Sequence, residues 1–336
     1  MQVWQIQESY GLDHLRLAEA KDPSPGPGQI VLAMKAAALN YRDLVTVKGM
    51  AGHFPLPLIP FSDGAGEVIA VGAGVSRVKT GDRVCPAFFQ SWLDGPVADY
   101  SRAEALGGSA QGVLQEKLLI SAEGVSRIPD HLTWQEAATL PCAGLTAWRA
   151  LSIEAPVGSG QSVLVQGTGG VSIFALQFAK ARGARVIVTS SSDEKLARAR
   201  KLGADDVINY KTHPEWGKKA LELTGGKGVD VVVEVGGENT LAQSMEAARN
   251  GGSVVVIGIL SGYASPLFIP ALFAKNLRLI GISVGSRRQF DEMADAIARW
   301  KLKPVIDRAF PFKDVPAALR LMEGGGHFGK IVVEIG

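Results

Sequence analysis

Cysteine is scarce in this chain. Only Cys85 and Cys142 occur among its 336 residues, which is too few for a disulfide framework or a four-cysteine zinc site. No apolar run approaches the length of a membrane span, and residues 1–8 lack the basic and apolar segments of a signal peptide. We therefore expect a cytoplasmic protein with no membrane partner.

A large excess of charge of either sign is also missing. The formal net charge is +2, from 35 Lys and Arg against 33 Asp and Glu, so the charge balance does not predict nucleic acid as a partner. With 46% hydrophobic and 20% charged residues, the composition is that of an ordinary globular enzyme or binding protein. A chain of this length predicts two domains.

The motif around which the chain is organised lies at residues 161–180. A short apolar run at 162–166 precedes a glycine-rich turn, and the residues after the turn are apolar at helical spacing. The turn comprises Gly167, Thr168, Gly169, Gly170 and Val171. In a strand–turn–helix unit of this kind, backbone N–H groups and the helix dipole face a diphosphate. Ser172 replaces the last glycine of G-x-G-x-x-G but is small enough for close packing, and an ordinary strand–helix turn is the alternative.

The pattern of predicted secondary structure changes along the chain. Residues 1–128 contain short strand-like runs divided by glycine and proline, and residues 133–150 are helix-like in two pieces interrupted at Pro141. Strand-like and helix-like segments then alternate, with strands predicted at 162–166, 185–189, 206–208, 229–235, 253–259 and 278–282. Helical crossovers between such strands predict a doubly wound parallel sheet, whose ligands lie at the carboxyl ends of the strands.

Seven short motifs, in this order and spacing, accompany the glycine turn. They are P-G-P-G-Q-I-V at 25–31, L-N-Y-R-D at 39–43, G-A-G-E-V at 64–68, V-K-T-G-D-R-V at 78–84, L-P-C-A-G-L-T-A-W at 140–148, V-I-N-Y at 207–210 and H-F-G-K at 327–330. Together they resemble the medium-chain dehydrogenase/reductase superfamily, and within it the zinc-independent quinone oxidoreductase-like branch. The resemblance covers nearly the whole chain.

This resemblance implies an α/β protein of two domains with the active site between them. We expect a GroES-like β domain from residues 1–128 and 285–336, and a Rossmann dinucleotide-binding domain from residues 129–284. Relatives commonly pair through the edges of their Rossmann sheets, and residues 278–282 would otherwise form an exposed apolar edge. A homodimer is therefore predicted.

The residues that match zinc ligands are mostly replaced. Zinc alcohol dehydrogenases hold the catalytic metal with a cysteine in the stretch matching 40–43, a histidine–glutamate pair matching Ser62 and Asp63, and a cysteine matching Cys142. Here only Cys142 keeps its ligand type, and Cys142 with Asp63 is too few for a four-coordinate site. We predict no zinc, with Cys142 a small buried residue.

The end of the second predicted strand suggests which cofactor is bound. It reads I-V-T-S-S-S at 187–192, with no acid before Asp193. An acid there would bind a ribose 2′-hydroxyl and repel a 2′-phosphate, so its lack favours NADPH over NADH. Alternatively, Asp193 caps the next helix and Lys195 is simply solvated. The cofactor contacts expected here and from the resemblance, besides the glycine turn, are Asn40, Thr146, Ser190, Ser191, Lys195, Tyr210, Val235, Gly258, Ile259 and, at the diphosphate, Lys330.

Loss of the metal points to a particular class of substrate. Without zinc to polarise a carbonyl, simple alcohol–ketone exchange loses its main electrophile. Quinones and conjugated enones delocalise the incoming charge, so hydrogen-bond donors and one proton source suffice. The catalytic candidates are Asn40, Tyr41, Asp43, Ser62 and Asp63.

Each candidate has its own expected role. Asn40 would donate its amide and Tyr41 a proton, while Asp63 would orient Ser62 or pair with Arg42. His53 is a further candidate acid or a surface-loop residue. The sequence thus predicts an NADPH-dependent, zinc-independent reductase of small-molecule quinones or activated alkenes and carbonyls. The alternatives are an alcohol dehydrogenase of simple alcohols and aldehydes, and a non-catalytic nucleotide-binding protein.

Overall fold

The computed structural model describes residues 1–52, 54–98 and 104–336, and the chain divides into two compact units. Unit 1 comprises Met1–Leu145 and Val284–Gly336, and unit 2 comprises Thr146–Ser283. The predicted boundary at residue 128 is therefore too early. Residues 129–145 belong to unit 1 because α3 (Trp134–Ala138) packs on strands β3 (Gln29–Ala38) and β4 (Asp63–Val71) of that unit.

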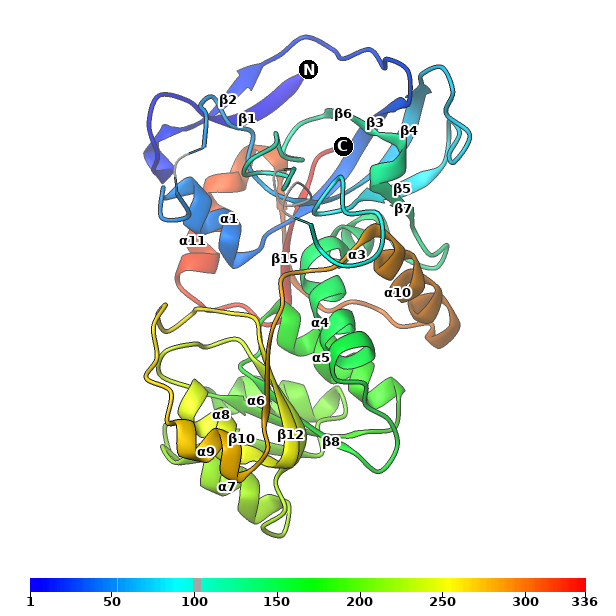
Figure 1. Cartoon of the computed structure of the whole chain (residues 1–336). Coiled ribbons are helices and arrows are strands. Elements are labelled where there is room, and N and C mark those ends of the chain that lie inside the picture. The colour runs from blue at the N-terminus through cyan, green and yellow to red at the C-terminus, as the bar shows by residue number, and fades with distance from the viewer. Residues whose placement is uncertain (53, 99–103) are drawn as a thin grey trace. The chain divides into compact units, whose positions relative to one another are not determined.

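Unit 1 is built on a seven-stranded sheet, and Figure 1 labels its strands apart from β14. Its strands run in the order β14-β15-β3-β4-β5-β7, with β6 also pairing with β3. Apart from the parallel pair β14 and β15, neighbouring strands are antiparallel. The other strands are β5 (Arg83–Pro86), β6 (Lys117–Ser121), β7 (Val125–Arg127), β14 (Ile306–Pro311) and β15 (Lys330–Glu334), and β1 (Gln2–Ile6) pairs separately with β2 (Leu15–Glu19).

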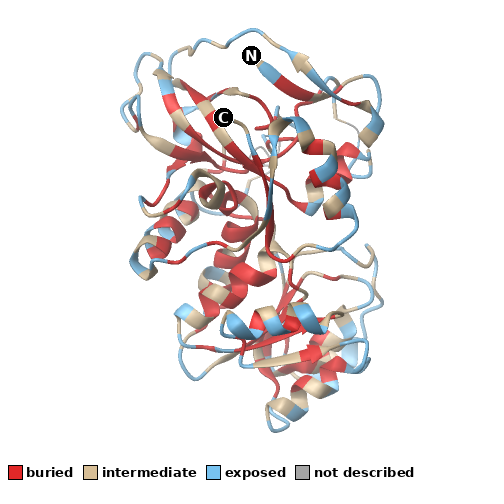
Figure 2. Cartoon of the chain, turned by 180° about the vertical axis from the view of Figure 1, so that it is seen from behind, coloured by how far each residue is buried: buried red, intermediate tan, exposed pale blue. Residues whose placement is uncertain are grey.

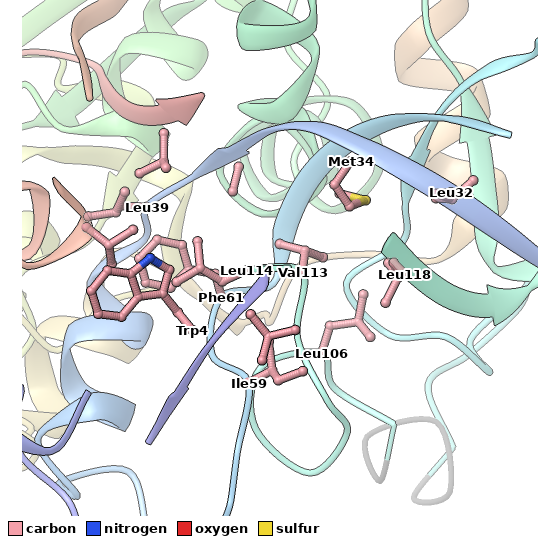
Figure 3. Close-up of a cluster of buried hydrophobic side chains, with 14 of the residues drawn as sticks. Trp4, Leu32, Met34, Leu39, Ile59, Phe61, Leu106, Val113, Leu114 and Leu118 are labelled. Carbon is pink, nitrogen blue, oxygen red and sulfur yellow. The ribbon is translucent and has the colours of Figure 1, made fainter. Parts of the chain in front are cut away.

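A large core cluster lies in this unit. Besides α3, the described α-helices of unit 1 are α1 (Tyr41–Val47), α10 (Arg287–Trp300) and α11 (Val315–Glu323). Figure 3 shows part of the core, where Trp4, Leu39, Phe61 and Leu114 lie together. Leu44 of α1 belongs to the same cluster. The end of β3 and the start of α1 are therefore anchored by burial of apolar side chains, which is the main driving force for folding.

Unit 2 is a six-stranded parallel sheet in the order β10-β9-β8-β11-β12-β13. The strands are β8 (Ser162–Gln166), β9 (Arg185–Ser190), β10 (Asp206–Asn209), β11 (Val229–Glu234), β12 (Ala248–Val256) and β13 (Arg278–Gly281). All six strands expected from the sequence are present. The predicted ends of β11 and β12 are slightly too late, so Val235, Gly258 and Ile259 follow their strands.

Helices connect these strands in the way that a parallel sheet requires. They are α5 (Gly170–Ala181), α6 (Asp193–Lys201), α7 (Trp216–Leu223), α8 (Leu241–Ala247) and α9 (Ile269–Ala274). The central strands are buried, as Figure 2 shows by colour, and Val163, Leu164 and Val165 of β8 are fully inaccessible. The order of the strands reverses between β8 and β11, which places the expected ligand site at their carboxyl ends.

The segment that leads to α5 includes wider helical turns. π-Helical stretches at Leu140–Gly144 and Ala150–Glu154 flank α4 (Leu145–Arg149). The predicted interruption at Pro141 is thus a change of helix type rather than a break. Among the described residues, no helix has the length and apolar character needed to cross a membrane.

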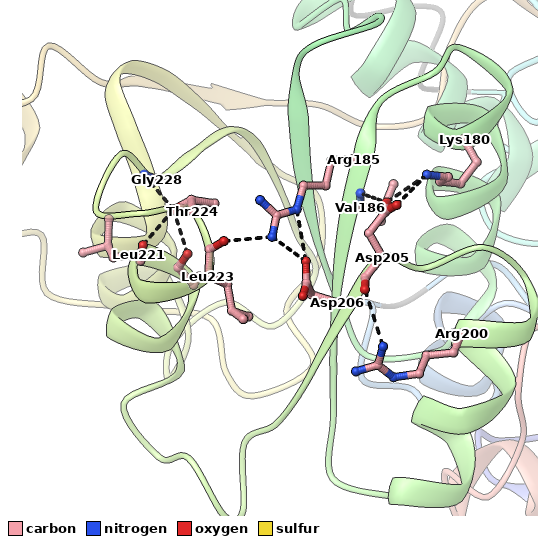
Figure 4. Close-up of polar contacts among 11 residues, drawn as sticks. Lys180, Arg185, Val186, Arg200, Asp205, Asp206, Leu221, Leu223, Thr224 and Gly228 are labelled. Atoms are coloured by element: carbon pink, nitrogen blue, oxygen red, sulfur yellow. Dashed lines mark hydrogen bonds and ion pairs between the residues drawn. The ribbon is translucent and has the colours of Figure 1, made fainter.

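Ion pairs anchor the amino ends of β9 and β10 (Figure 4). Lys180 pairs with Asp205 at 2.8 Å, and Arg185 pairs with Asp206 at 2.7 Å. Partly exposed pairs of this kind contribute only about 0–1 kcal/mol each. This end of the sheet is opposite the glycine turn, so these charges support the sheet rather than a ligand.

Candidate active site

The glycine turn of unit 2 leaves open space where a dinucleotide would bind. It connects β8 to α5, and Gly167 has a left-handed φ of 68° that disfavours any side chain. A Cβ added at Gly167 or Gly169 would meet no atom within 4 Å. The first N–H groups of α5 have no partner inside the helix and face outward at its positive end. The turn therefore fits the diphosphate of a nicotinamide dinucleotide.

Ser172 explains how the turn tolerates the missing third glycine. Its side chain is 2% exposed, and its Oγ donates a hydrogen bond to the carbonyl oxygen of Gln166 at 2.6 Å. The serine thus fastens the first turn of α5 to the end of β8, where a glycine would only permit close packing.

The predicted 2′-phosphate residues come from neighbouring strand ends. Ser190 ends β9 and pairs in register with Asn209 of β10, and the N–H of Tyr210 donates to the carbonyl oxygen of Ser190 at 3.1 Å. Ser191 and Tyr210 are therefore adjacent to this pair, and Lys195 lies in the first turn of α6, which follows. The backbone thus brings these residues to one edge of the sheet, and their contact with a 2′-phosphate stays a prediction.

The structure also shows what Asp193 does. Ser192, not Asp193, is the N-cap of α6, and its Oγ accepts from the N–H of Lys195 at 3.3 Å. The carboxylate of Asp193 accepts from Asn209 Nδ2 at 2.7 Å. Its interaction with Asn209 gives Asp193 a structural role, so the expectation that it caps the helix is wrong.

The remaining predicted cofactor residues of unit 2 lie at two further places. A Cβ on Gly258 would be 2.2 Å from the carbonyl oxygen of Val235, so these two backbones touch and glycine is required. Ile259 follows and is 41% exposed. Thr146 lies in α4 and is buried.

A buried polar network beneath these residues was not anticipated from the sequence. Glu234 is fully inaccessible, and its Oε1 accepts from the N–H groups of Gly236 and Gly237 and from Thr240 Oγ1 at 2.6–2.9 Å. Its Oε2 accepts from Gln166 Nε2 at 2.7 Å and from the hydroxyl of Ser244. The sequence did contain a sign of this network. Glu234 ends a run of buried valines, and a buried carboxylate needs hydrogen-bond donors.

Unit 1 contains a second cluster, at the start of α1. Asn40 is the N-cap, its N–H donates to Asp43 Oδ2 at 2.7 Å, and the two residues form a capping box. Arg42 Nη1 lies 3.3 Å from Asp43 Oδ1 and also donates to the carbonyl oxygen of Leu106 at 2.7 Å. Arg42 thus pairs with Asp43. One of the two expectations for Asp63, that it pairs with Arg42, is therefore wrong.

Strand ends bring the other members of this cluster together. Ser62 Oγ donates to Asp63 Oδ1 at 2.7 Å, and the N–H of Cys142 donates to Asp63 Oδ2 at 3.0 Å. Lys330, at the start of β15, donates through Nζ to Asn40 Oδ1 at 2.6 Å and to the carbonyl oxygen of Leu39 at 2.5 Å. The same ammonium lies 3.9 Å from Asp63 Oδ2.

Burial dominates the electrostatics of this cluster. It raises the pKa of Asp43 to about 6, against the opposing effect of Arg42. Burial likewise raises the pKa of Asp63, while Lys330 opposes the rise. The pKa of the Cys142 thiol is also raised, first by burial and then by the nearby Asp63 carboxylate. Cys142 is therefore a neutral thiol at physiological pH.

Four of the five predicted catalytic residues meet here. Asn40, Asp43, Ser62 and Asp63 are each 8% exposed or less, whereas Tyr41 is 42% exposed and lies outside the buried cluster. Lys330 was expected at the diphosphate, but its ammonium is buried in unit 1 against Asn40 and Leu39. His53 lies outside the described residues.

Comparison with known proteins identifies the family. The alcohol dehydrogenase GroES-like domain matches residues 26–130, and the zinc-binding dehydrogenase domain matches residues 170–299. A zinc-type alcohol dehydrogenase-like protein of Schizosaccharomyces pombe is 42% identical, over 98% of this chain and 97% of its own. The chain belongs to the medium-chain dehydrogenase/reductase superfamily. It is an alcohol dehydrogenase-like oxidoreductase with a GroES-like domain and a Rossmann domain, as the sequence predicted.

Solved structures of this superfamily agree along the whole chain. A putative alcohol dehydrogenase from Sinorhizobium meliloti is 42% identical with a TM-score of 0.93, covering 99% of this chain and 98% of its own. A crotonyl-CoA carboxylase/reductase in complex with NADP is 25% identical with a TM-score of 0.89, covering 100% and 95%. A mycobacterial quinone oxidoreductase is 28% identical with a TM-score of 0.83 and full coverage of both chains. Members of the superfamily bind a nicotinamide cofactor.

The superfamily also includes zinc enzymes, but the donor atoms of this cluster do not suit zinc. In residues 1–52, 54–98 and 104–336, no group of three or more His, Cys, Asp and Glu side chains could hold a metal ion. Both oxygens of Asp63 already accept hydrogen bonds. The charges of Arg42, Lys330, Asp43 and Asp63 balance, and a divalent ion about 4 Å from the Lys330 ammonium would be repelled by roughly 8 kcal/mol at an effective dielectric constant of about 20.

A separate hollow of about 720 Å³ lies in unit 2 but is not the candidate site. Its lining includes Asp230, Ala248, Arg249 and Lys275, at or near the amino ends of β11 and β12. Arg249 pairs with Asp230 at 2.6 Å, and Lys275 donates to three carbonyl oxygens near the end of α8. Parallel sheets bind ligands at the opposite, carboxyl end.

Proposed function

We propose that this oxidoreductase is an NADPH-dependent, zinc-independent reductase of quinones or of activated alkenes and carbonyls. The observation that supports it best is the buried ammonium of Lys330, hydrogen-bonded to Asn40 and 3.9 Å from Asp63. The stretch 40–43 and the pair Ser62 and Asp63 match segments that carry ligands in the zinc enzymes of the superfamily. A lysine ammonium among them supplies a fixed cation instead of a Lewis acid.

Different residues would bind the three parts of the cofactor. The diphosphate is held by the glycine turn and α5. The 2′-phosphate is held by Ser191, Lys195 and Tyr210, and the nicotinamide riboside is contacted by Thr146, Val235, Gly258 and Ile259. When bound, the reduced nicotinamide supplies a hydride to the acceptor. Asn40 donates a hydrogen bond to the acceptor oxygen, and Ser62 and Asp63 support it. Tyr41 remains the candidate proton donor, because its side chain is 42% exposed and therefore accessible to a small molecule.

The first test measures NADPH oxidation by chelator-treated protein with an ortho-quinone as acceptor. We expect turnover that is unchanged by the chelator and by added zinc, because the cluster lacks a metal ligand set. NADH at the same concentration is the control and should support slower turnover. If only simple alcohols or aldehydes react, and only after zinc is added, the function is that of an alcohol dehydrogenase. The names of the relatives support that second candidate.

The cofactor preference can be tested at Ser191. Replacing Ser191 by aspartate places a carboxylate where the 2′-phosphate would bind, and an acid there instead accepts hydrogen bonds from a ribose 2′-hydroxyl. We expect the ratio of kcat/KM for NADPH over NADH to fall by about tenfold or more. Ser191→Asn has nearly the same volume without the charge and should change this ratio much less. Equal ratios for the two variants would show that no phosphate lies there.

We also propose that the protein is a cytoplasmic homodimer formed through β13. This strand pairs only with β12 and ends the sheet of unit 2. In the same unit, Phe268 and Phe273 are 70% and 66% exposed, a degree of apolar exposure that is typical of an interface. Gel filtration with light scattering at micromolar concentration should give twice the 35.4 kDa mass of the chain. A monomer would contradict this.

If NADPH binds but no acceptor in a panel of quinones, enones, aldehydes and alcohols is reduced, the proposed function fails. The protein would then be the non-catalytic nucleotide-binding relative that the sequence left open. Binding alone therefore does not support the reductase function, and turnover is the deciding measurement.

A further inference from the structure

Lys330 and Asp63 are the two charged ends of a buried hydrogen-bonded chain in unit 1. Lys330 is 3% exposed, Asn40 is 8% exposed, and Ser62 and Asp63 are fully inaccessible. The links run from Lys330 Nζ to Asn40 Oδ1 at 2.6 Å, from Asn40 Nδ2 to Ser62 Oγ at 3.5 Å, and from Ser62 Oγ to Asp63 Oδ1 at 2.7 Å. A cation thus connects to an anion through two neutral side chains.

The direction of every bond in this chain is determined by its chemistry. An ammonium can only donate, so the oxygen of the Asn40 amide must face Lys330. The Nδ2 group, which can only donate, then faces Ser62. The hydroxyl of Ser62 donates to the carboxylate of Asp63, which leaves its lone pairs to accept from Asn40. No other orientation of the Asn40 amide satisfies Lys330.

The backbone fixes Lys330 in this position. The N–H of Leu39 donates to the carbonyl oxygen of Ile331 at 3.0 Å, and β15 pairs with β3 from Val332 and Ala38 onward. Gly329 precedes Lys330 with a φ of 78°, and a Cβ there would be 2.4 Å from the carbonyl oxygen of Val305. Only glycine fits this turn, and the turn sets the point at which β15 begins, at Lys330.

We propose that Lys330 is a positioning residue that holds and polarises the Asn40 amide so that an Nδ2 hydrogen binds the acceptor oxygen of the substrate. This inference rests on the proposed reductase function. The contact from Asn40 to Ser62 is 3.5 Å, the longest in the chain, and the Asn40 amide also hydrogen-bonds the Asp63 carboxylate, whose pKa it lowers. An acceptor oxygen of the substrate would take the place of the long contact to Ser62 and receive one of the two Nδ2 hydrogens. Because an ammonium withdraws electron density from the amide oxygen, the N–H group becomes a stronger donor to developing negative charge.

A double-mutant cycle tests whether Lys330 acts through Asn40. We expect Lys330→Met and Asn40→Ala each to lower kcat by about 100-fold, as loss of one donor to a developing oxyanion does. The double variant should be no slower than Asn40→Ala, because the two residues act as one unit. Losses that multiply would overturn the proposal. Lys275→Met removes another partly buried ammonium that caps a helix of unit 2 and should leave kcat unchanged.

Binding of NADPH separates this role from the diphosphate contact that the sequence suggested. Titration of Lys330→Met with NADPH should give a Kd within about threefold of the wild type, since the ammonium is buried away from solvent. A large rise in Kd with kcat preserved would assign Lys330 to the cofactor and overturn the proposal. If Lys330→Met does not fold, Asn40→Asp replaces it: this variant keeps a partner for Lys330 but offers no N–H donor. Its kcat should fall similarly, and an unchanged kcat would overturn the proposal.

A spectroscopic measurement tests the same contact without any substrate. In protein labelled with ¹⁵N at asparagine, the side-chain signal of Asn40 is assigned by its loss in Asn40→Asp. We expect this signal to shift in Lys330→Met by more than any other asparagine signal, whereas Lys275→Met should leave it in place. An unshifted signal would show that Lys330 does not hold the amide. This shift is expected even if no acceptor is ever reduced, so failure of the reductase function and failure of this contact give different results.

Discussion

Replacing Gly169 by alanine is expected to abolish most of the NADPH binding while the fold remains intact. The backbone at Gly169 is extended, with φ −78° and ψ −175°, so alanine adopts it without strain. The new Cβ meets no protein atom within 4 Å but enters the space where the diphosphate approaches the start of α5. We expect the Kd for NADPH to rise by about tenfold or more, which corresponds to about 1.4 kcal/mol. Valine should weaken binding further.

Gly158→Ala provides a matched control for this substitution. Gly158 also has open space around its Cβ position, but it precedes β8 and lies at the amino end of the sheet. Calorimetric titration with NADPH should give an unchanged Kd for Gly158→Ala, and both variants should unfold within about 2 °C of the wild type. If Gly169→Ala binds NADPH as tightly as Gly158→Ala does, the diphosphate does not lie on this turn.

Replacing Glu234 by alanine is expected to give the largest loss of stability. Each carboxylate oxygen of Glu234 accepts at least two hydrogen bonds, and the N–H of Gly237 donates to this carboxylate. Removing the carboxylate leaves buried donors unpaired and creates a cavity at the end of β11. We expect the free energy of unfolding, measured by urea titration, to fall by about 3 kcal/mol.

Two further variants show whether this loss comes from the hydrogen bonds. Glu234→Gln keeps an acceptor for Gly236 and Gly237 but turns an NH₂ group toward Gln166, so we expect a loss of about 1–2 kcal/mol. Glu238 lies on the same loop and is exposed, so Glu238→Ala should change stability by less than about 0.5 kcal/mol. If Glu234→Ala is as stable as Glu238→Ala, the network contributes nothing to the fold.

Local patterns in the sequence were enough to predict most of unit 2. Its strands are short runs rich in valine and isoleucine that alternate with helix-like segments, so the type and order of the elements follow from short-range patterns. The glycine turn was also predictable, because a tight turn requires glycines and these are visible in the sequence itself. The boundary between the units was less predictable, since α3 is helical by pattern but joins unit 1 by packing.

The sequence by itself determined the superfamily, the two kinds of domain, the glycine turn and the candidate residues Asn40, Asp43, Ser62 and Asp63. Only the tertiary structure decided which groups Lys330 contacts, because its hydrogen bond to Asn40 joins residues 290 positions apart. Such a contact depends on the register of β15 against β3, which no local propensity encodes. The same holds for Glu234, whose donors come from three segments. Because these polar side chains are buried, their hydrogen bonds have fixed partners and directions, which the same side chains would not have on the surface.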